Sequence, residues 1–360
     1  MSALQPQQVN VATVPFLDLT RSNGPVSRAV LAELGEVIDA NAFSNGPQVA
    51  AFEEAFAAYC GTTHCIGVAS GLDALRLALA AELEPGERVA VPAATFAATF
   101  EAVTQAGGTP VPVDVRDDDA LLDAEAIPDG IRVVMPVHLY GRVATVPARY
   151  TVVADACQAH GALGAAEGRA AAFSFYPGKN LGAFGDAGAL VTDAAQLAAR
   201  VRALREHGQT AKYHHEYEGW TARLDTVQAV ALLHKLPHLD RSNAERRAAA
   251  ALYGEALVGL GDLRLPAPAG DEHVWHLYVV RTADPDSLAA SLRERGVGTG
   301  RHYPVPPHLS PAYAWLGYRE GSFPAAERLS RECLSLPIFP GITEAEIAQV
   351  ADAVAAYFDG

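Results

Sequence analysis

Two ionisable side chains follow predicted strands in the way that is typical of a ligand site. Asp155 comes directly after the apolar run YTVVA, and Lys179 lies just beyond the run AAFSF. Open α/β sheets bind ligands at the carboxyl ends of their strands, so both residues are candidates for chemistry. An N-cap of the following turn is an about equally frequent use of such an aspartate. Lys179 is one of only three lysines, with Lys212 and Lys235.

Two glycine-containing segments predict a place for a phosphate. Lys179 lies in the stretch YPGKNLGAFGDAG, where the glycines allow the backbone to approach a ligand closely. The segment SGLD at residues 70–73 opens a predicted helix, whose first amides favour an anion. The chain has no GxxxxGK[ST], because Asn180 follows the lysine, and no GxGxxG at the start of a helix. The common nucleotide-binding motifs are therefore not indicated.

A lysine for a Schiff base, a carboxylate for a ring nitrogen and helix amides for a phosphate are together what pyridoxal 5'-phosphate (PLP) requires. A series of segments adds to this pattern: VPFLDL, SNGPQVAAFEEAFAAYCG, ASGLDALRLAL, PVHLYG, DACQAHGA, FSFYPGKNLGAFGDAGA and RLDTVQA. In this order they resemble the DegT/StrS family of PLP-dependent nucleotide-sugar aminotransferases, from about residue 14 to the C-terminus. The resemblance implies a fold-type-I aminotransferase that works as a homodimer with sites at the subunit interface.

The resemblance also implies roles for individual residues. Lys179 matches the lysine that binds PLP covalently and then moves a proton between cofactor and substrate. Asp155 matches the carboxylate that faces the pyridine nitrogen and keeps it protonated. Gln158 matches the residue that contacts the ring oxygen, and Phe96 the aromatic side chain that stacks on the ring, although Phe96 alone would read as core. The phosphate-binding positions are matched by Gly71, Leu72 and Ser174.

The chain departs from the family pattern in three places. Relatives usually supply an asparagine in Gly-x-Asn-x-Arg to the partner's cofactor phosphate, whereas this chain has Thr221 in GWTAR. Thr221 can still donate a hydrogen bond. Relatives usually place a helix within residues 141–150, where this chain has room only for a short loop. The stretch 160–173 is also shortened, and Cys157 stands where small residues are common.

The substrate side is indicated by the string RHYPVPPHL at residues 301–309, which resembles the members that act on dTDP-linked 3-keto-6-deoxyhexoses. Prolines hold such a loop extended. The resemblance implies substrate contacts for His302, Tyr303 and His308, and contacts with sugar or diphosphate for Tyr176 and the partner's Lys212. The alternative for each histidine is an ordinary surface or capping residue.

The predicted reaction moves the amino group of L-glutamate to PLP, which becomes pyridoxamine phosphate, and then to the keto carbon of a nucleotide-linked deoxysugar. A 4-keto or UDP-linked sugar is the alternative substrate, and a non-catalytic regulatory member of the fold is the alternative class. A sugar 3-dehydratase would carry histidine in place of Lys179. The lysine therefore argues against that activity.

The elements that must position these residues follow an α/β pattern. Strands alternate with helical segments, of which 71–81 and 96–105 are the clearest, and several strands lack polar alternation, as strands covered on both faces do. We expect a mostly parallel central sheet with flanking helices. The predicted strands are 88–92, 110–114, 132–136, 150–154, 171–175 and 188–192.

The pattern changes after about residue 225. A helical stretch runs to residue 258, followed by strands at 276–281 and 297–300 and two late helices, the last with a capping box of Thr343 and Glu346. We expect an N-terminal tail (1–12), a large PLP-binding α/β domain (13–238) and a smaller C-terminal α+β domain (239–360).

Composition limits the remaining possibilities. Half of the 360 residues are hydrophobic, which favours a compact chain over disorder, and the net charge of −15 opposes binding to nucleic acid or anionic lipid. The four cysteines form no CxxC pair, and the adjacent side chains of His214 and His215 diverge, so we expect neither a metal nor disulfides. No apolar run reaches about 18 residues and no signal pattern opens the chain, so we expect a cytoplasmic protein without a membrane span.

Overall fold

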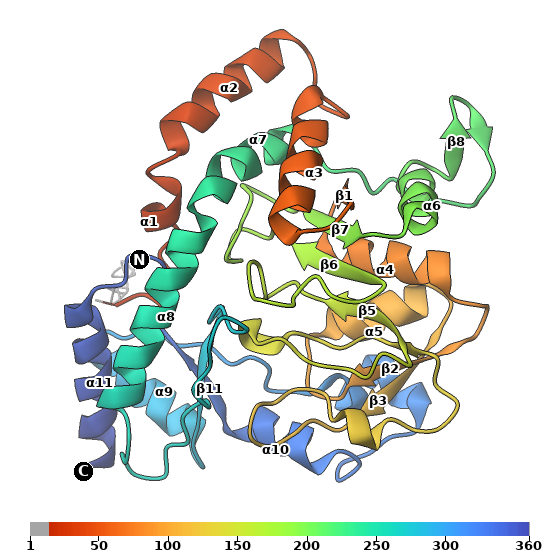
Figure 1. Ribbon diagram of the computed structural model, residues 1–360. Helices are drawn as coiled ribbons and strands as arrows, with labels where there is room; N and C mark the ends of the chain where they lie inside the picture. Colours follow the sequence, from red (N-terminus) through yellow and green to blue (C-terminus); the bar gives the residue numbers. More distant parts are fainter. Residues whose placement is uncertain (1–13, 360) are drawn as a thin grey trace, which may run out of the picture.

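The computed structural model describes residues 14–359, and its centre is a seven-stranded sheet (Figure 1). The strand order is β1-β7-β6-β5-β4-β2-β3. Only β7 runs antiparallel to its neighbours, so the predicted, mostly parallel sheet is confirmed. The strands are β1 (His64–Val68), β2 (Arg88–Pro92), β3 (Thr109–Val113), β4 (Val133–Val134), β5 (Thr151–Asp155), β6 (Ala170–Ser174) and β7 (Gly188–Thr192).

Helices cover both faces of this sheet (Figure 1). One face packs against α3 (Pro47–Cys60) and α7 (Thr226–Lys235), and the other against α4 (Gly71–Glu82), α5 (Ala97–Gln105) and α6 (Ala195–Arg205). The strands between them are almost wholly buried, which explains their lack of polar alternation. Two further helices, α1 (Leu19–Asn23) and α2 (Ser27–Asp39), precede α3 in the chain.

The helix that follows β1 is defined by its first residues. The Ser70 side chain caps α4 by accepting a hydrogen bond from the Asp73 amide at 3.0 Å, and Leu75 and Leu79 are buried on one side of the helix. Serine at this position thus fixes the start of α4 at Gly71. Gly71 lies next to Ser174, the last residue of β6.

A second core lies at the C-terminal side (Figure 1). It is formed by α8 (Leu239–Ala256), α9 (Pro285–Glu294) and α11 (Glu344–Phe358), with β10 (Tyr278–Arg281) antiparallel to β11 (Cys333–Leu336). The predicted capping box of α11 is present, because Thr343 and Glu346 exchange side-chain and backbone hydrogen bonds. α10 (Pro324–Glu332) precedes β11. The division of the chain at residue 238 stays a prediction, and the predicted tail lies outside the described residues.

Several short elements differ from the expectations. The predicted strand at 297–300 is wrong, because Val297 bridges to Val14 and Gly300 to Ser335, so that the two ends pair with different segments. β1 and β11 were not predicted, and three late helices, α9, α10 and α11, are present where two were expected. The helical stretch after residue 225 is broken at Pro237, which lacks an amide hydrogen and lies in a 3₁₀ turn between α7 and α8. In the segment 141–150, where a short loop was expected, Gly141 ends a 3₁₀ helix and residues 142–150 contain no helix.

The remaining elements are short. A hairpin is formed by β8 (Gln209–Ala211) and β9 (His214–His215), and the 3₁₀ helices are Ala124–Ala126, Leu139–Gly141, Leu236–His238, Pro307–Leu309 and Pro311–Leu316. Within residues 14–359, no helix combines the length and the apolar character that crossing a bilayer requires. The four cysteines are all free.

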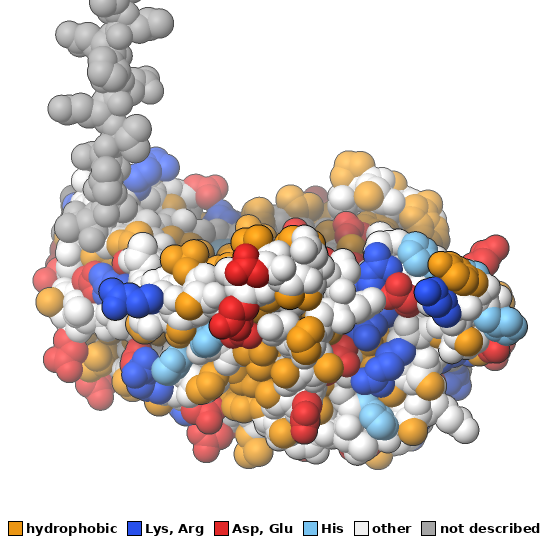
Figure 2. Space-filling model, turned by 90° about the horizontal axis from the view of Figure 1, so that it is seen from above, with side chains coloured by type: hydrophobic (Ala, Val, Ile, Leu, Met, Phe, Trp, Pro, Cys, Tyr) orange, Lys and Arg blue, Asp and Glu red, His pale blue; other side chains and the backbone are white. Residues whose placement is uncertain are grey.

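Figure 2 shows the molecule from above, with apolar side chains spread over the middle of this face and basic and histidine side chains gathered toward the right side. α2 lies along the top of the molecule in Figure 1, and its Leu31 and Ile38 are 69% and 59% exposed. Large apolar side chains are thus exposed to solvent on a helix that lies outside the central layers.

Candidate active site

A cavity of about 350 Å³ lies where β5 and β6 end and α4 begins. Its lining also includes residues of the segments that precede α5 and follow Gly300. Most of the predicted site residues meet here, although they are far apart in the sequence. They are Gly71, Leu72, Phe96, Asp155, Gln158, Ser174, Tyr176, Lys179 and Tyr303.

Lys179 is held by a tight loop after β6. Its amide donates to the Tyr176 carbonyl at 2.8 Å, and a side chain at Gly182 would meet the Pro177 carbonyl oxygen at 2.3 Å. The next residue, Asn180, donates to Asn243 of α8 at 2.9 Å and thereby ties the loop to the C-terminal core. Burial lowers the pKa of the Lys179 amine below its ordinary value. A larger fraction of the amine is therefore neutral and nucleophilic near neutral pH.

Asp155 is the last residue of β5, and each oxygen of its buried carboxylate accepts a hydrogen bond from the chain. The Cys157 amide donates to Oδ1 at 3.1 Å, and the Thr99 hydroxyl donates to Oδ2 at 3.2 Å. An ionised carboxylate accepts about four hydrogen bonds, so each oxygen retains acceptor capacity. The aspartate is thus oriented and still able to face a cationic donor in the cavity.

The start of α4 forms a cradle whose free amides and nearby hydroxyl suit a phosphate. Gly71 and Leu72 occupy its first turn, where amides have no intrahelical acceptor, and Ser174 lies opposite at the end of β6. A Cβ atom at Gly71 would meet Ser174 Cβ at 2.6 Å and Cys157 Sγ at 2.7 Å. Only glycine leaves this space open.

Gln158 and three aromatic side chains complete the lining. Gln158 Oε1 accepts from the Tyr140 amide at 2.6 Å, and Nε2 donates to the Tyr303 hydroxyl at 3.1 Å, which leaves one amide hydrogen for a ligand. The Phe96 ring lies 5.2 Å from the Tyr303 ring. Phe96 and Tyr176 are more than half exposed, so their rings are available to a ligand.

Two predicted residues lie on the surface of the chain. Lys212 is exposed between β8 and β9, and Thr221 is exposed with its Oγ1 3.0 Å from His207 Nε2. Neither residue lines the cavity. Because the contacts expected of both involve a partner subunit, they stay predictions.

His302 and His308 also lie outside the lining of the cavity. Burial, with the nearby charge of Lys179, lowers the pKa of His302 to about 4, and its Nδ1 lies 2.8 Å from Ser335 Oγ. His308 is wholly buried, with Nε2 3.2 Å from the Glu327 carboxylate. The structure therefore does not place His308 against a substrate, because its ring anchors the 301–309 loop to α10.

The sequence reasoning missed several lining residues. Thr95, Glu101 and Asp186 contribute to the cavity wall, and Thr99 lies directly behind Asp155. Both threonines flank Phe96 in the string PAATFAAT, four residues apart. This spacing puts two hydroxyls on one side of a helix start, which was the available signal.

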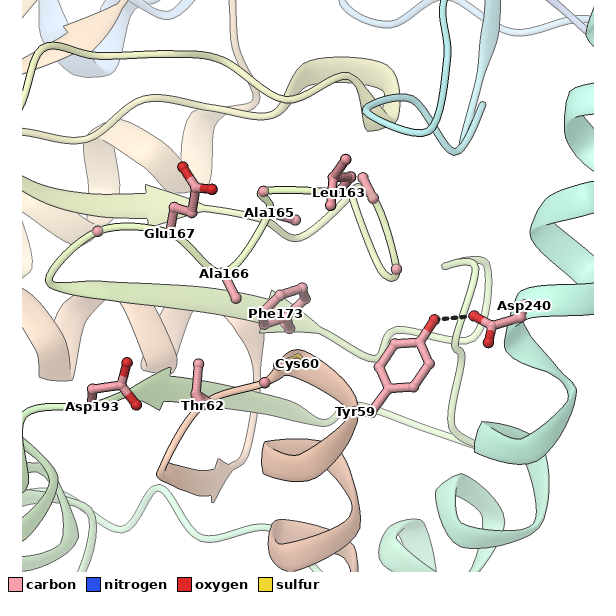
Figure 3. Close-up of a pocket in the computed structure, with 15 residues that line it drawn as sticks. Tyr59, Cys60, Thr62, Leu163, Ala165, Ala166, Glu167, Phe173, Asp193 and Asp240 are labelled. Atoms are coloured by element: carbon pink, nitrogen blue, oxygen red, sulfur yellow. Dashed lines mark hydrogen bonds between the residues drawn. The ribbon is translucent and has the colours of Figure 1, made fainter.

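A more open hollow of about 640 Å³ lies elsewhere, between the end of α3 and the loop 161–168 (Figure 3). Its lining contains no lysine, and its Tyr59 hydroxyl is bound to Asp240 at 2.5 Å. Glu167 and Asp193 belong to its lining and come from separate segments (Figure 3). Without an amine or an anion-binding helix start, this hollow does not offer the chemistry that the Lys179 cavity offers.

The Lys179 cavity fits PLP. The cradle that Gly71 keeps open would hold the phosphate, Asp155 would face the ring nitrogen, and Lys179 supplies the amine for covalent attachment. A sheet of this topology with a lysine, an aspartate and a helix start at the ends of its strands defines the class of PLP-dependent aminotransferases.

Comparison with known proteins gives the family. Residues 26–355 match the model of the DegT/DnrJ/EryC1/StrS aminotransferase family, and the chain belongs to this family. It is 46% identical to the dTDP-3-amino-3,4,6-trideoxy-alpha-D-glucose transaminase of Streptomyces venezuelae, over 95% of both chains. The protein is thus an aminotransferase, as the resemblance implied.

Solved structures agree with this result. S. venezuelae DesV in complex with a ketimine intermediate superposes with a TM-score of 0.90 at 44% identity, covering 96% of this chain and 99% of that one. The Bacillus subtilis protein NtdA with bound pyridoxamine phosphate gives a TM-score of 0.89 at 29% identity, covering 99% and 87%. The predicted fold and the PLP cofactor are confirmed.

Proposed function

We propose that this aminotransferase moves the amino group of L-glutamate onto a nucleotide-linked keto-deoxysugar, most closely a dTDP-3-keto-6-deoxyhexose, in amino-sugar biosynthesis. The observation that carries the proposal is the near-complete match to a dTDP-sugar transaminase, combined with the cavity around Lys179. The loop 301–309 supports the same substrate class, since it brings Tyr303 to the cavity while His308 and Glu327 lock its far end.

Each residue of the proposed site has a separate role in the reaction. When bound, PLP supplies an electron-withdrawing ring that the twenty side chains lack. Lys179 provides the amine that attaches the cofactor and then carries the proton between the reacting carbons at Nζ. Asp155 keeps the ring nitrogen protonated, the first turn of α4 and Ser174 bind the phosphate, and Gln158 contacts the ring oxygen.

We also propose a homodimer in which each site is completed by the other subunit. The exposed apolar side chains of Leu31 and Ile38 on α2 (Figure 1) favour burial against a second copy. Lys212 and Thr221 are exposed away from the chain's own cavity, as residues that serve a partner's site would be. A reducing cytoplasm is the proposed location, in keeping with four free cysteines.

The substrate assignment is tested with purified protein, PLP, L-glutamate and a panel of sugar nucleotides. We expect dTDP-3-keto-6-deoxyhexose to yield an amino sugar, detected by mass spectrometry, with higher kcat/KM than 4-keto or UDP-linked sugars. Equal or higher kcat/KM for a UDP-linked or 4-keto sugar would replace the assignment. An enzyme that aminates none of these sugars would leave the proposed substrate class without support.

A further inference from the structure

A pair of buried threonine hydroxyls lies behind the site aspartate. Thr99 Oγ1 is 3.2 Å from Asp155 Oδ2 and 2.7 Å from Thr95 Oγ1. Thr99 is fully buried and Thr95 is 3% exposed, so bulk water does not compete for these contacts. Thr99 lies in the first turn of α5, and Phe96, at the start of the same helix, lines the cavity.

The direction of these hydrogen bonds follows from the chemistry of the groups. An ionised carboxylate only accepts, so the single hydroxyl hydrogen of Thr99 must point to Asp155. Thr99 then has only acceptor capacity left for Thr95, and the Thr95 hydroxyl must be the donor between the two. The result is a one-way chain from Thr95 through Thr99 to Asp155.

We propose that Thr99 is a positioning residue for the reaction, with Thr95 orienting it. The Thr99 hydroxyl fixes Oδ2 while the Cys157 amide fixes Oδ1, so the carboxylate plane is set before a cofactor binds. Other charged or titratable groups that act on this carboxylate from the cavity side are Lys179, Cys157 and Tyr303. This inference rests on the proposed role of Asp155 toward the ring nitrogen.

A neighbouring threonine shows what a merely structural hydroxyl looks like in this helix. Thr104 of α5 donates back to the carbonyls of Phe100 and Glu101, at 3.2 and 3.1 Å. Such a bond stays within the helix. Thr99 instead reaches across to β5. Thr104→Val is therefore a matched control for Thr99→Val, since both remove one hydroxyl from the same helix at constant volume.

The test compares Thr99→Val, Thr99→Ser, Thr104→Val and the unmodified enzyme. The readouts are the dissociation constant of PLP and the pH at which the absorbance of the lysine-bound cofactor changes. We expect Thr99→Val to weaken PLP binding about tenfold, because the Asp155 side chain must then be ordered when the cofactor binds. A carboxylate that no longer keeps its plane toward the ring nitrogen also holds the proton there less firmly. The spectral change then moves to higher pH, because less positive charge on the ring raises the pKa of the nitrogen that joins the lysine to the cofactor.

Thr99→Ser keeps the hydroxyl and is expected to behave like the unmodified enzyme, as is Thr104→Val. If Thr99→Val does not fold, Thr99→Ala replaces it, because it differs from Thr99→Ser by the hydroxyl alone. A hydroxyl-free variant with the affinity and pH profile of the control would overturn the inference. If the unmodified enzyme formed no lysine-bound cofactor, the proposed function itself would fail, which separates the two failures.

Discussion

At the scale of single residues, the chemistry depends on one amine in a largely buried setting. Burial lowers the pKa of Lys179, while the negative charge of Asp155 acts in the opposite direction. Burial also raises the pKa of Cys157, which keeps this thiol protonated and unreactive beside the lysine. The cavity thus contains one strong nucleophile.

Replacing this amine tests its role directly. Lys179→Ala is expected to abolish the absorbance band of lysine-bound PLP and to lower the rate of amino transfer at least about 10³-fold, since both attachment and proton transfer are lost. Spectra and single-turnover rates with L-glutamate measure both effects.

Lys235→Met is the control, because Lys235 lies outside the cavity and its Nζ donates to Asn23 at 2.9 Å. It should retain the band. A Lys179→Ala enzyme with near-normal turnover would contradict the assignment.

The sequence predicted most cavity residues because they lie at strand ends or in family motifs. Ser174 and Phe96 were identified by resemblance alone, since each has an ordinary core role as an alternative. Thr99 was missed because its partner, Asp155, is 56 positions away and only the fold brings them together. The contact of His308 with Glu327 of α10 was not anticipated for a similar reason, and a substrate contact of His308 stays a prediction.

At the scale of elements, the contact between the start of α4 and the end of β6 determines whether a phosphate fits. Gly71→Ala would place a methyl group 2.6 Å from Ser174 Cβ, so the helix start must shift. We expect PLP binding to weaken by about 1 to 3 kcal/mol, the usual cost of overpacking. Equilibrium titration with PLP measures this change.

Gly254→Ala in α8 provides the comparison, because nothing lies within 4 Å of the added atom. This control should keep its PLP affinity and gain about 0.5 to 1 kcal/mol of stability from higher helix propensity. If the PLP affinity of Gly71→Ala were unchanged, the phosphate would not bind at the contact between the start of α4 and the end of β6.

Element boundaries were predictable where local signals are strong, as for α4 with its serine cap and α11 with its capping box. β1 was missed because its five residues contain Gly67 and a flanking His64, which give a weak strand signal next to a helix. The segment 297–300 reads as a strand, yet its ends pair with Val14 and Ser335, which local sequence does not encode.

At the scale of the whole molecule, a charged cluster ties the first helix to the last. Arg21 of α1 donates to Glu346 of α11 at 2.8 Å, and its guanidinium lies 5.1 Å from the Phe339 ring. The bond with Arg21 lowers the pKa of Glu346 to about 2. The N-terminal segment is thereby fixed to the C-terminal core.

Arg21→Ala is expected to lower the free energy of unfolding by about 1 to 2 kcal/mol at pH 7, for this partly buried, multiply bonded pair. Since the pKa of Glu346 is depressed in the folded state, the stabilisation is complete above its ordinary pKa of 4.5 and is lost as pH falls toward 2. Denaturant titrations at pH 7, 5 and 3 should show the difference from the unmodified protein shrinking between pH 5 and 3.

Arg28→Ala on α2 serves as a surface control and should show no such dependence. A difference between Arg21→Ala and the unmodified protein that is constant from pH 7 to pH 3 would contradict this account of the cluster.

The proposed sharing of active sites between two subunits makes a further prediction at this scale. Mixing Lys179→Ala subunits with Lys212→Ala subunits should restore activity to about a quarter of normal, because half of a random set of dimers are hybrids with one intact site. Each variant alone should be far less active. Activity measured after refolding the mixture, compared with the separate variants, checks this, and no recovery in confirmed hybrids would contradict a shared site.

The central claim is that Lys179 binds PLP and that L-glutamate supplies the amino group. The most direct measurement is the absorbance spectrum of the purified, PLP-supplied protein before and after addition of L-glutamate. We predict a yellow band of lysine-bound cofactor that glutamate converts to the pyridoxamine form. A protein that forms no such band with added PLP would contradict the catalytic account, and a band that glutamate leaves unchanged would contradict the assignment of the donor.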